Sequence, residues 1–457
     1  MGKLFGTDGV RGIANVELTA EIAMKIGKAA ASVLVKNTPG KAKILIGKDT
    51  RLSCDVLEGA LVAGICSVGV DVVCLGVIPT PAVAFLVKKY RANAGIMISA
   101  SHNSFEFNGI KIFGENGYKL PDKVESVIER IVLNDVPIDV SEVKYADLGT
   151  RTNADRAIDD YIEHIASTID ADLTGLKVAF DCANGAAFRT AKRLFTRLGV
   201  ECTIKNCRPN GTNINKNCGS MHMEGLARFV KENGLDAGIA FDGDADRCLA
   251  VDELGNIVDG DFIMAICAMS LNEQRKLAKG TVVGTVMTNI GFNHFCGGNQ
   301  LKFVATRVGD RYVLEEMLKN GYNFGGEQSG HVIFLDHSTT GDGQLTAVQL
   351  LSILKRSGKK LSKLAGVMQK LPQVMLNVKV DNLGKLKFHT DEEIKNAIDR
   401  VSAKFEPGNA DTCGRGRIIV RVSGTEPLIR IMLEGENLDR ITVLANEVAD
   451  LVRKRLS

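Results

Sequence analysis

The sequence predicts an α/β protein with three similar mixed α/β domains, whose sheets are rich in parallel strands, followed by a C-terminal α+β domain. Two observations predict this fold class. Short apolar strands alternate with helices as far as residue 370, which is typical of parallel sheets covered by helices on both faces. After Leu371 the pattern changes to longer strands of alternating polarity, such as "QVMLNVKV" and "PLIRIMLEGE".

The first domain is expected over residues 1–150, and its strands are short and apolar. "KILIGKDT" is typical of a buried strand that ends in a polar turn. The expected elements are a strand at 43–50, a helix at 53–68, a strand at 70–76, a helix after Pro81 and the strand "AGIMIS".

The next two domains, expected over residues 151–257 and 258–370, repeat this layout with different letters. The second should contain a helix as far as residue 169, a strand at 177–185, a helix through residue 198, the strand "VECTIKN" and an acidic loop near residue 242. The third should contain a helix from residue 261, a strand at 280–289, a helix, the strand "KFVATRVGD" and a helix to residue 320. The fourth domain, residues 371–457, is expected to combine alternating strands with two helices.

Composition and charge exclude several classes of protein. Lysine and arginine total 57, aspartate and glutamate total 54, and the net charge is +3; aromatic residues make up 5%, with no tryptophan. A nucleic-acid partner usually requires a larger or more clustered basic excess, so none is expected. The most apolar window, from Gly59, contains Asp71 and several glycines, and fits a helix followed by a strand better than a membrane span.

The cysteines and the opening residues predict the compartment. The eleven cysteines are scattered without a CxxC pair, and "MGKLFGTDGVRG" lacks the apolar segment of a signal peptide. Such cysteines are most simply reduced thiols. A cytoplasmic protein is therefore expected, with no membrane partner.

The acidic loop "FDGDADR" carries three carboxylates at alternate positions, Asp242, Asp244 and Asp246. Carboxylates so close repel one another unless a cation neutralises them, and oxygen ligands favour Mg²⁺ or Ca²⁺ over zinc. An EF-hand needs glycine at its sixth position, where Arg247 stands, and the flanks "AGIAF" and "CLAVD" are typical of strands. A solvated acidic turn is the other alternative. The loop predicts one Mg²⁺ site, beside which Arg247 suits a phosphate.

The segment "RVSGTEPLIR" predicts a second anion site. Ser423, Gly424 and Thr425 offer two hydroxyls and closely spaced backbone N–H groups, between Arg421 and Arg430. This combination favours a phosphate, whereas a polar hairpin turn would look similar without the arginines. The chain has neither G-x-x-x-x-G-K-[ST] nor G-x-G-x-x-G, which argues against a nucleotide as the main ligand.

Three further motifs are weak when each is taken alone. "GGEQSGH" places Glu327 and Ser329 on a glycine-rich loop, where they can bind sugar hydroxyls, although an ordinary turn is the alternative. "GTDGVRG" carries one cation, Arg11. In "SASHNSFEFNGIK" a polar loop with Ser101 and His102 follows a buried strand, and Lys111 comes soon after.

Together these motifs predict phosphoryl transfer. A serine hydroxyl near a metal-bound carboxylate cluster can carry a phosphoryl group whose oxygens complete the Mg²⁺ shell, so Ser101 is also a candidate metal ligand. His102 and Lys111 are candidates for moving a proton or stabilising charge, although a histidine taken singly more often has a structural role. A second phosphate site suits a substrate that is already phosphorylated.

The motifs resemble the signatures of the α-D-phosphohexomutase superfamily. "SASHN", "DGDADR", "GEQSGH" and "RVSGTEP" stand one per domain in the order of that family, and the resemblance spans the whole chain. It implies four domains around a central cleft. Within the superfamily, Ser99, Gln328, "TRVGDRYVLEEM" and "LFGTDGVRG" are most similar to the bacterial enzymes that act on glucosamine phosphates.

The resemblance also implies a role for each candidate residue. Ser101 would be the phosphoserine, and the three aspartates would hold Mg²⁺ together with its phosphate. The residues expected near the transferring phosphoryl group are Arg11, His102 and Lys111. The residues expected to bind or orient the sugar are Glu327, Ser329, Arg307 and Gly309. The residues expected to bind the other phosphate are Arg421, Ser423, Gly424, Thr425 and Arg430.

One departure from the family concerns the polar loop that contains Ser101 and His102, which we call the serine loop. Members usually have proline after "SHN", and this chain has Ser104 there. Because proline restricts the backbone, the loop loses some of its built-in stiffness.

The resemblance implies an isomerase, an intramolecular phosphotransferase that interconverts glucosamine 6-phosphate and glucosamine 1-phosphate. The reaction would pass through a phosphoserine and a sugar 1,6-bisphosphate, which also serves as activator, and would feed the synthesis of UDP-N-acetylglucosamine. Glucose or mannose phosphates are alternative substrates, and a non-catalytic phosphosugar sensor is a remote alternative. An exposed apolar face on the first domain would allow a homodimer.

Overall fold

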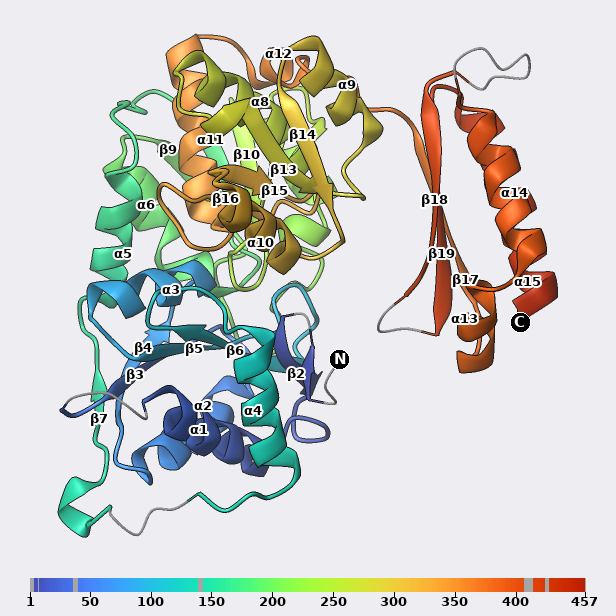
Figure 1. Cartoon of the computed structure of the whole chain (residues 1–457). Helices are drawn as coiled ribbons and strands as arrows, with labels where there is room; N and C mark the ends of the chain where they lie inside the picture. The colour runs from blue at the N-terminus through green and yellow to red at the C-terminus, as the bar shows by residue number, and fades with distance from the viewer. Residues whose placement is uncertain are drawn as a thin grey trace. The chain divides into compact units, whose positions relative to one another are not determined.

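The computed structural model describes residues 4–6, 8–35, 40–138, 143–406, 414–423 and 427–456 (Figure 1). The chain divides into two compact units. Unit 1 comprises Met1–Met287 and Leu301–Val367, and unit 2 comprises Thr288–Gln300 and Met368–Ser457.

Unit 1 begins with a mixed sheet in which one half of the strands is parallel. In sheet order the strands are β1 (Phe5–Gly6), β2 (Gly9–Ile13), β6 (Phe107–Gly114), β5 (Ala94–Ile98), β3 (Lys43–Lys48), β4 (Asp71–Val77) and β7 (Arg151–Asn153). β5, β3, β4 and β7 run parallel, whereas β6, β2 and β1 join by antiparallel pairing. The carboxyl ends of β3 and β5 therefore lie side by side, which places the loops after them together.

Helices cover both faces of this sheet (Figure 1). The helices are α1 (Ala20–Leu34), α2 (Cys54–Cys66) and α4 (Asp122–Leu133) on one face and α3 (Thr80–Lys89) on the other. α1 begins after Thr19, whose side-chain oxygen accepts a hydrogen bond from the Ile22 N–H at 3.4 Å and so caps the helix. Ile26, Leu61 and Ile128, one from each helix of the first face, are fully buried in a shared core with the sheet.

β7 is a strand that the sequence analysis did not predict. Arg151–Asn153 pairs with the edge of β4, and the helix α5 (Ala157–Ala166) follows it and ends three residues before the predicted limit at residue 169. All three residues of β7 are exposed, so the strand lacks the apolar pattern that identifies a buried strand in a sequence.

The next two sheets of unit 1 follow the predicted alternation. In sheet order their strands are β12 (Ile257–Val258), β11 (Cys248–Asp252), β10 (Ala237–Phe241), β8 (Lys177–Asp181) and β9 (Glu201–Lys205), then β14 (Lys302–Thr306), β13 (Thr281–Thr285), β15 (Phe324–Gly326) and β16 (Val332–Phe334). Their α-helices are α5, α6 (Ala191–Arg197), α7 (Glu224–Glu232), α8 (Gly260–Glu273), α10 (Asp310–Asn320), α11 (Gly343–Ser357) and α12 (Leu361–Ala365). Short 3-10 helices occur at Tyr145–Asp147, Ala186–Arg189, Gly219–Met221 and Ala278–Gly280.

Unit 2 contains the predicted α+β region, with an antiparallel sheet, together with residues 288–300, which the sequence analysis placed in the third domain. In sheet order the strands are β17 (Gln373–Lys379), β19 (Leu428–Gly435) and β18 (Gly416–Val422). The helices are α9 (Ile290–Gly298), α13 (Asn382–Phe388), α14 (Glu392–Ala403) and α15 (Leu438–Leu456). Ile431 of β19 packs with Val448 and Val452 of α15 in the core. α13 is a short addition to the two helices predicted after Leu371.

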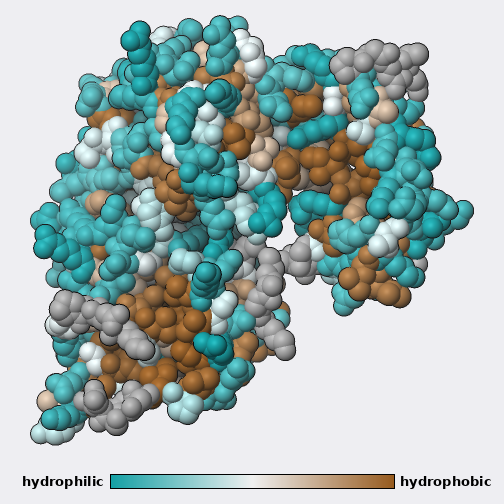
Figure 2. All heavy atoms as spheres, viewed as in Figure 1, coloured by the Kyte–Doolittle hydropathy of each residue, from teal (hydrophilic) through white to brown (hydrophobic). Residues whose placement is uncertain are grey.

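The surface of unit 1 is mostly polar on the side that Figure 2 shows, and apolar side chains gather over the region of α1 and α2. Met24 of α1 and Leu52 and Val56 near the start of α2 are exposed. The homodimer stays a prediction. Within the described residues, no helix combines the length and the apolar character that a membrane span requires. The ten cysteines that the structure describes are free thiols, as predicted.

Candidate active site

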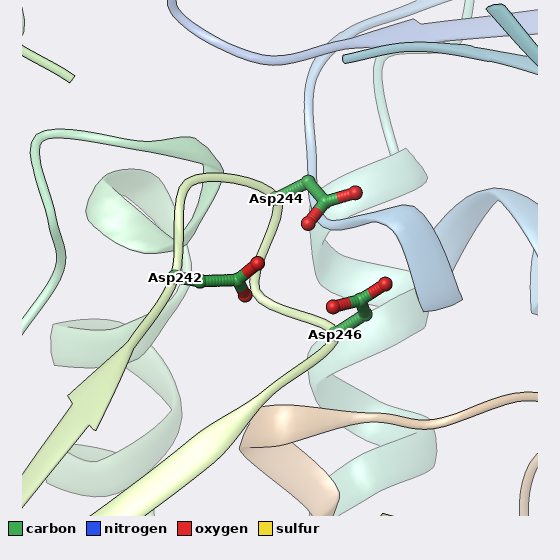
Figure 3. Close-up of side chains that lie close together, drawn as sticks. All are labelled: Asp242, Asp244 and Asp246. Atoms are coloured by element: carbon green, nitrogen blue, oxygen red, sulfur yellow. The ribbon is translucent and has the colours of Figure 1, made fainter. Parts of the chain in front are cut away.

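The acidic loop closes the hairpin between β10 and β11. Phe241, the last residue of β10, pairs with Cys248, the first of β11, so the residues between them turn within one loop. The side chains of Asp242, Asp244 and Asp246 converge from this loop (Figure 3), with potential ligand oxygens within 4.8 Å of one another. All three side chains are buried.

The charges in this loop fit a divalent cation. Burial raises the pKa of Asp242 well above its usual value, and the negative charges of Asp246 and Asp244 raise it further. Two carboxylate oxygens, Oδ1 of Asp244 and Oδ1 of Asp246, are buried without a hydrogen-bond partner among the described residues. Converging carboxylate oxygens with unused acceptor capacity are what Mg²⁺ ligation requires, so the residues present fit the predicted ion.

Ser101 lies directly beside the acidic loop, although 141 positions separate it from Asp242 in the sequence. Its Oγ donates a hydrogen bond to Asp242 Oδ2 at 2.6 Å and lies 3.3 Å from His102 Nδ1. The φ angle of Ser101 is 51°, in the left-handed region that residues other than glycine seldom adopt. The serine loop and the acidic loop are far apart in the sequence, and only their proposed shared chemistry linked them. In unit 1 they are neighbours.

Lys111 is a buried cation between the two loops. It lies on β6 opposite Met97 of β5, and its Nζ is 2.8 Å from Asp244 Oδ2 and 3.4 Å from Asp246 Oδ2. Burial alone would lower the pKa of Lys111, but the negative charges of Asp244, Asp8 and Asp246 raise it well above its usual value. Lys111 therefore remains protonated and neutralises part of the acidic loop.

Arg11, His102 and Arg247 complete the charge around the serine. Arg11, on β2, donates a hydrogen bond from Nη1 to Asn103 Oδ1 at 3.1 Å. Burial lowers the pKa of His102 to about 4, and the positive charges of Arg247 and Arg11 also lower it, so the imidazole is neutral at neutral pH. Nε of Arg247 is buried and has no hydrogen-bond partner in the described part of the chain. It can donate to an anion.

The "GEQSGH" motif forms the turn between β15 and β16. Glu327 Oε1 accepts a hydrogen bond from the Gly309 N–H at 3.1 Å, and Ser329 Oγ is buried with no partner within the described ranges. Burial tends to lower the pKa of Arg247, but nearby negative charges raise it. Glu327 is one of these charges, after larger contributions from Asp242 and Asp246. The motif is thus electrostatically connected to the acidic loop.

The loop that was predicted to orient the sugar precedes α10. Gly309 has a φ of 131°, which favours glycine, and it stands directly before the helix. Arg307 is exposed, and its guanidinium carbon lies 4.1 Å from the ring centre of Tyr312, in a cation–π contact.

The "RVSGTEP" motif lies in unit 2, and its described residues stand at the end of β18 and just before β19. Arg421 pairs with Arg430 across the two strands, and the Ser423 N–H donates to the Leu428 carbonyl at 2.9 Å. Burial lowers the pKa of Arg421, and the positive charge of Arg430 lowers it further. Two like charges on facing strands favour an anion between them. The predicted Gly424 and Thr425 lie outside the described residues.

Sequence reasoning missed residues that connect the motifs of unit 1, namely Asp8, Lys119, Asp310 and His331. Lys119 forms ion pairs with Asp8 and, at 2.5 Å, with Asp310. His331 lies 3.5 Å from Asp310 and 3.6 Å from Asp246. Asp8, Asp310 and His331 stand inside motifs quoted from the sequence, but each acquires its role from partners far away along the chain, which local spacing does not reveal.

Profiles of one family match nearly the whole chain. They are the phosphoglucomutase/phosphomannomutase α/β/α domain I at residues 2–137, domain II at 159–255, domain III at 259–371 and the C-terminal domain at 375–451. The order of the matches is the order of the motifs.

Full-length relatives and solved structures agree with these profiles. The chain is 55% identical to a phosphoglucosamine mutase of Clostridium tetani, covering 100% of both chains, and 53% identical to one of Clostridium novyi, covering 100% of this chain and 99% of the other. The crystal structure of a phosphoglucomutase/phosphomannomutase family protein from Burkholderia thailandensis matches with a TM-score of 0.81 at 24% identity, over 100% of this chain and 99% of that one.

A second solved structure shares the fold at lower identity. Aspergillus fumigatus N-acetylphosphoglucosamine mutase, in complex with GlcNAc-6P and magnesium, matches with a TM-score of 0.72 at 18% identity, over 100% of this chain and 96% of that one. At such identities the two structures show the fold alone. With four family profiles in order and relatives above 50% identity over their full length, the chain belongs to the phosphoglucomutase/phosphomannomutase family, in its phosphoglucosamine mutase branch.

Proposed function

We propose that the protein is an isomerase that interconverts glucosamine 6-phosphate and glucosamine 1-phosphate. The observation that carries the proposal is the 2.6 Å hydrogen bond between Ser101 Oγ and Asp242, which sets a serine hydroxyl against a buried acidic cluster. The names of the full-length relatives support glucosamine as the sugar.

The proposed reaction moves a phosphoryl group between Ser101 and the sugar. The bond between phosphorus and Ser101 Oγ breaks, a bond to the free sugar hydroxyl forms, and a sugar 1,6-bisphosphate results. In the second half the other phosphoryl group returns to Ser101. The hydroxyl proton needs an acceptor, and the neutral imidazole of His102 suits this role better than Lys111, whose charge three carboxylates maintain.

Asp242, Asp244 and Asp246, together with the phosphate on Ser101, would hold one Mg²⁺. When bound, the ion supplies positive charge that neutralises the transferring phosphoryl group. Arg247 would donate its unused Nε–H to the same phosphate, and Arg11 is a second candidate donor.

The remaining candidate residues would bind the sugar and its second phosphate. Glu327 and Ser329 have the acceptor and hydroxyl groups that sugar hydroxyls require. The proposed phosphate site is Arg421, Ser423, Gly424, Thr425 and Arg430, and the proposed orienting loop contains Arg307 and Gly309. Both ends of the sugar must reach Ser101 in turn, so this phosphate site has to accept either orientation.

The proposed product would feed the synthesis of UDP-N-acetylglucosamine, a precursor of peptidoglycan, in the cytoplasm. The bacterial origin of the full-length relatives supports this role.

Glucose or mannose phosphates are the second candidate substrates, because the family profiles carry the names of those mutases. Their chemistry at Ser101 would be the same, so only the sugar distinguishes the two proposals. We expect kcat/KM to be higher for glucosamine 1-phosphate than for glucose 1-phosphate or mannose 1-phosphate. A clear preference for glucose or mannose would replace the glucosamine proposal.

Ser101→Ala tests the phosphate carrier. Intact mass before and after incubation with glucose 1,6-bisphosphate and Mg²⁺ should show one added phosphate in the parent protein and none in Ser101→Ala, which should also lose mutase turnover. Ser104→Ala makes the same change in the same loop and should keep both. Full turnover in Ser101→Ala would exclude the proposed mechanism.

A further inference from the structure

We propose that Arg51 and Asn215 are positioning residues that hold the backbone of the serine loop so that Ser101 Oγ faces the acidic loop. The inference rests on the proposed function, in which Ser101 carries the phosphoryl group. Neither residue belongs to a motif that the sequence analysis singled out.

The two side chains bind the same pair of backbone carbonyls. Nη2 of Arg51 donates to the carbonyl oxygens of Ser101 and Asn103, both at 2.9 Å. Nδ2 of Asn215 donates to the same two oxygens, also at 2.9 Å each. Arg51 and Asn215 are both buried. We call this arrangement of two donors and two carbonyls the carbonyl square.

The donors of the carbonyl square come from different parts of unit 1. Arg51 follows β3 and is fixed by Asp49, whose Oδ2 accepts from Arg51 Nε at 2.9 Å in a fully buried ion pair. Asn215 lies in the segment that follows β9, a strand of the same five-stranded sheet as β10 and β11, and it has a left-handed φ of 58°. Arg51 therefore holds the serine loop from the seven-stranded sheet to which the loop belongs. Asn215 holds it from the side of the five-stranded sheet that carries the acidic loop.

The serine loop needs such support for two reasons. Ser101 has a φ of 51°, a conformation that persists in a non-glycine residue only where surrounding contacts determine it. Ser104 replaces the usual proline, so the chain itself is less restricted. Arg51 compensates there, because its Nη1 also donates to the Ser104 carbonyl.

The carbonyl square also sets the position of the acidic loop. A Cβ added to Gly243 would lie 2.5 Å from the Ser101 carbonyl oxygen and 2.8 Å from Asn215 Nδ2. The backbone of Gly243 therefore packs directly on the square, between Asp242 and Asp244. Loss of the square would shift Ser101 relative to Asp242, and a misplacement of about 1 Å can slow a positioned reaction by about a hundredfold.

Asn215→Asp tests the inference, because it keeps the size of the side chain and its tolerance of a left-handed φ but removes the N–H donor. Asn217→Asp is the matched control, since Asn217 stands in the same loop with a φ of 52° and is exposed. Asn215→Gly and Asn217→Gly repeat the comparison without adding charge. The readouts are the single-turnover transfer of phosphate from glucose 1,6-bisphosphate to Ser101 in the full chain with Mg²⁺, together with steady-state kcat and KM.

Both Asn215 variants should transfer phosphate at least about tenfold more slowly than their Asn217 controls and lose kcat to the same extent. KM should change by less than about threefold, because the sugar-binding residues are untouched. Transfer at the control rate, or a loss confined to KM, would overturn the inference. A parent protein that takes up no phosphate on Ser101 would instead overturn the proposed function.

Arg51→Lys tests the other donor and keeps the inference falsifiable if the Asn215 variants unfold. Lysine keeps a positive charge beside Asp49 but lacks the planar fork that reaches several carbonyls. We expect the same slow transfer with little change in KM, and a parental rate in folded Arg51→Lys would contradict a positioning role.

Discussion

Lys111 shows how a single residue can make an acidic site tolerable before a metal binds. A fully buried lysine is rare unless it is paired, and here Asp244, Asp246 and Asp8 lie within 3.4 Å of its ammonium group. The pKa of Asp246 is lowered well below its usual value because Lys111 and His331 outweigh burial, whereas burial and its neighbours raise that of Asp242. Asp242, the carboxylate that binds Ser101, is therefore the one whose negative charge is least compensated and which takes up a proton most readily.

Asp342 is a second buried carboxylate, and it gives a prediction about pH. It caps α11 by accepting from the Leu345 N–H at 2.9 Å, and both of its oxygens accept from the Tyr161 hydroxyl at 2.9 Å. Burial raises the pKa of Asp342 to about 7. Between about pH 4 and pH 7 the folded protein keeps this proton while the unfolded chain releases it, so this group lowers stability as pH rises, by up to about 1.4 kcal/mol per pH unit.

Asp342→Asn should remove this dependence, because an amide does not titrate and asparagine is an equally good helix cap. The midpoint of thermal unfolding, measured in EDTA, should increase in the variant relative to the parent between pH 5 and pH 8. Asp381→Asn, which makes the same change at the exposed cap of α13, is the matched control. A difference for Asp342→Asn that does not change with pH would contradict the expectation.

At the scale of elements, α1 and α2 depend on two glycines for their close contact. A Cβ on Gly64 of α2 would lie 2.2 Å from the carbonyl oxygen of Met24, and one on Gly27 of α1 would lie 2.8 Å from that of Leu61. A Cβ on Gly59, in the same helix as Gly64, would meet no atom within 4 Å. The backbones of the two helices therefore touch on one side of α2 only.

Gly64→Ala and Gly59→Ala should consequently have opposite effects. Overpacking at Gly64 should destabilise the protein by about 1–3 kcal/mol. Gly59→Ala should stabilise it by about 0.5–1 kcal/mol, because alanine restricts the unfolded chain and costs nothing in the folded helix. Urea unfolding midpoints of the two variants, compared with the parent, measure both effects, and a decrease for Gly59→Ala would show that α2 packs differently.

Most elements of the fold could be predicted from local sequence, and the exceptions have a physical reason. β3, β8 and β13 are buried, so their apolar letters identify them. β7 is exposed and exists because the edge of β4 offers it hydrogen bonds, which is information that lies elsewhere in the chain. α13 is equally hard to predict, since only Gly384 and Phe388 of its residues are buried.

At the scale of the whole molecule, the candidate site is assembled from segments that the sequence cannot place together. The motifs themselves could be predicted, because "FDGDADR" and "RVSGTEPLIR" each concentrate one kind of chemistry in a few residues. The contacts that hold Ser101 within unit 1 could not, because Arg51 and Asn215 reach it across 50 and 114 positions. Neither residue has a local signature.

The two proposed binding sites lie in different units, which gives a prediction for hydrogen exchange. The proposed Mg²⁺ ligands all lie in unit 1, and the proposed second phosphate site lies in unit 2. Mg²⁺ alone should therefore slow amide exchange in residues 242–247 and leave β17, β18 and β19 unchanged. At a hundred times its dissociation constant the ion should stabilise its region by about 2.7 kcal/mol.

Addition of glucose 1,6-bisphosphate together with Mg²⁺ should extend the protection to β18 and β19, because a phosphate would neutralise the facing charges of Arg421 and Arg430. Asp244→Asn is the control for the first effect: it should weaken protection by Mg²⁺ in the acidic loop, since it removes one proposed ligand charge. Protection of unit 2 by Mg²⁺ alone, or unchanged exchange in both units with the bisphosphate, would contradict this assignment of the two binding sites.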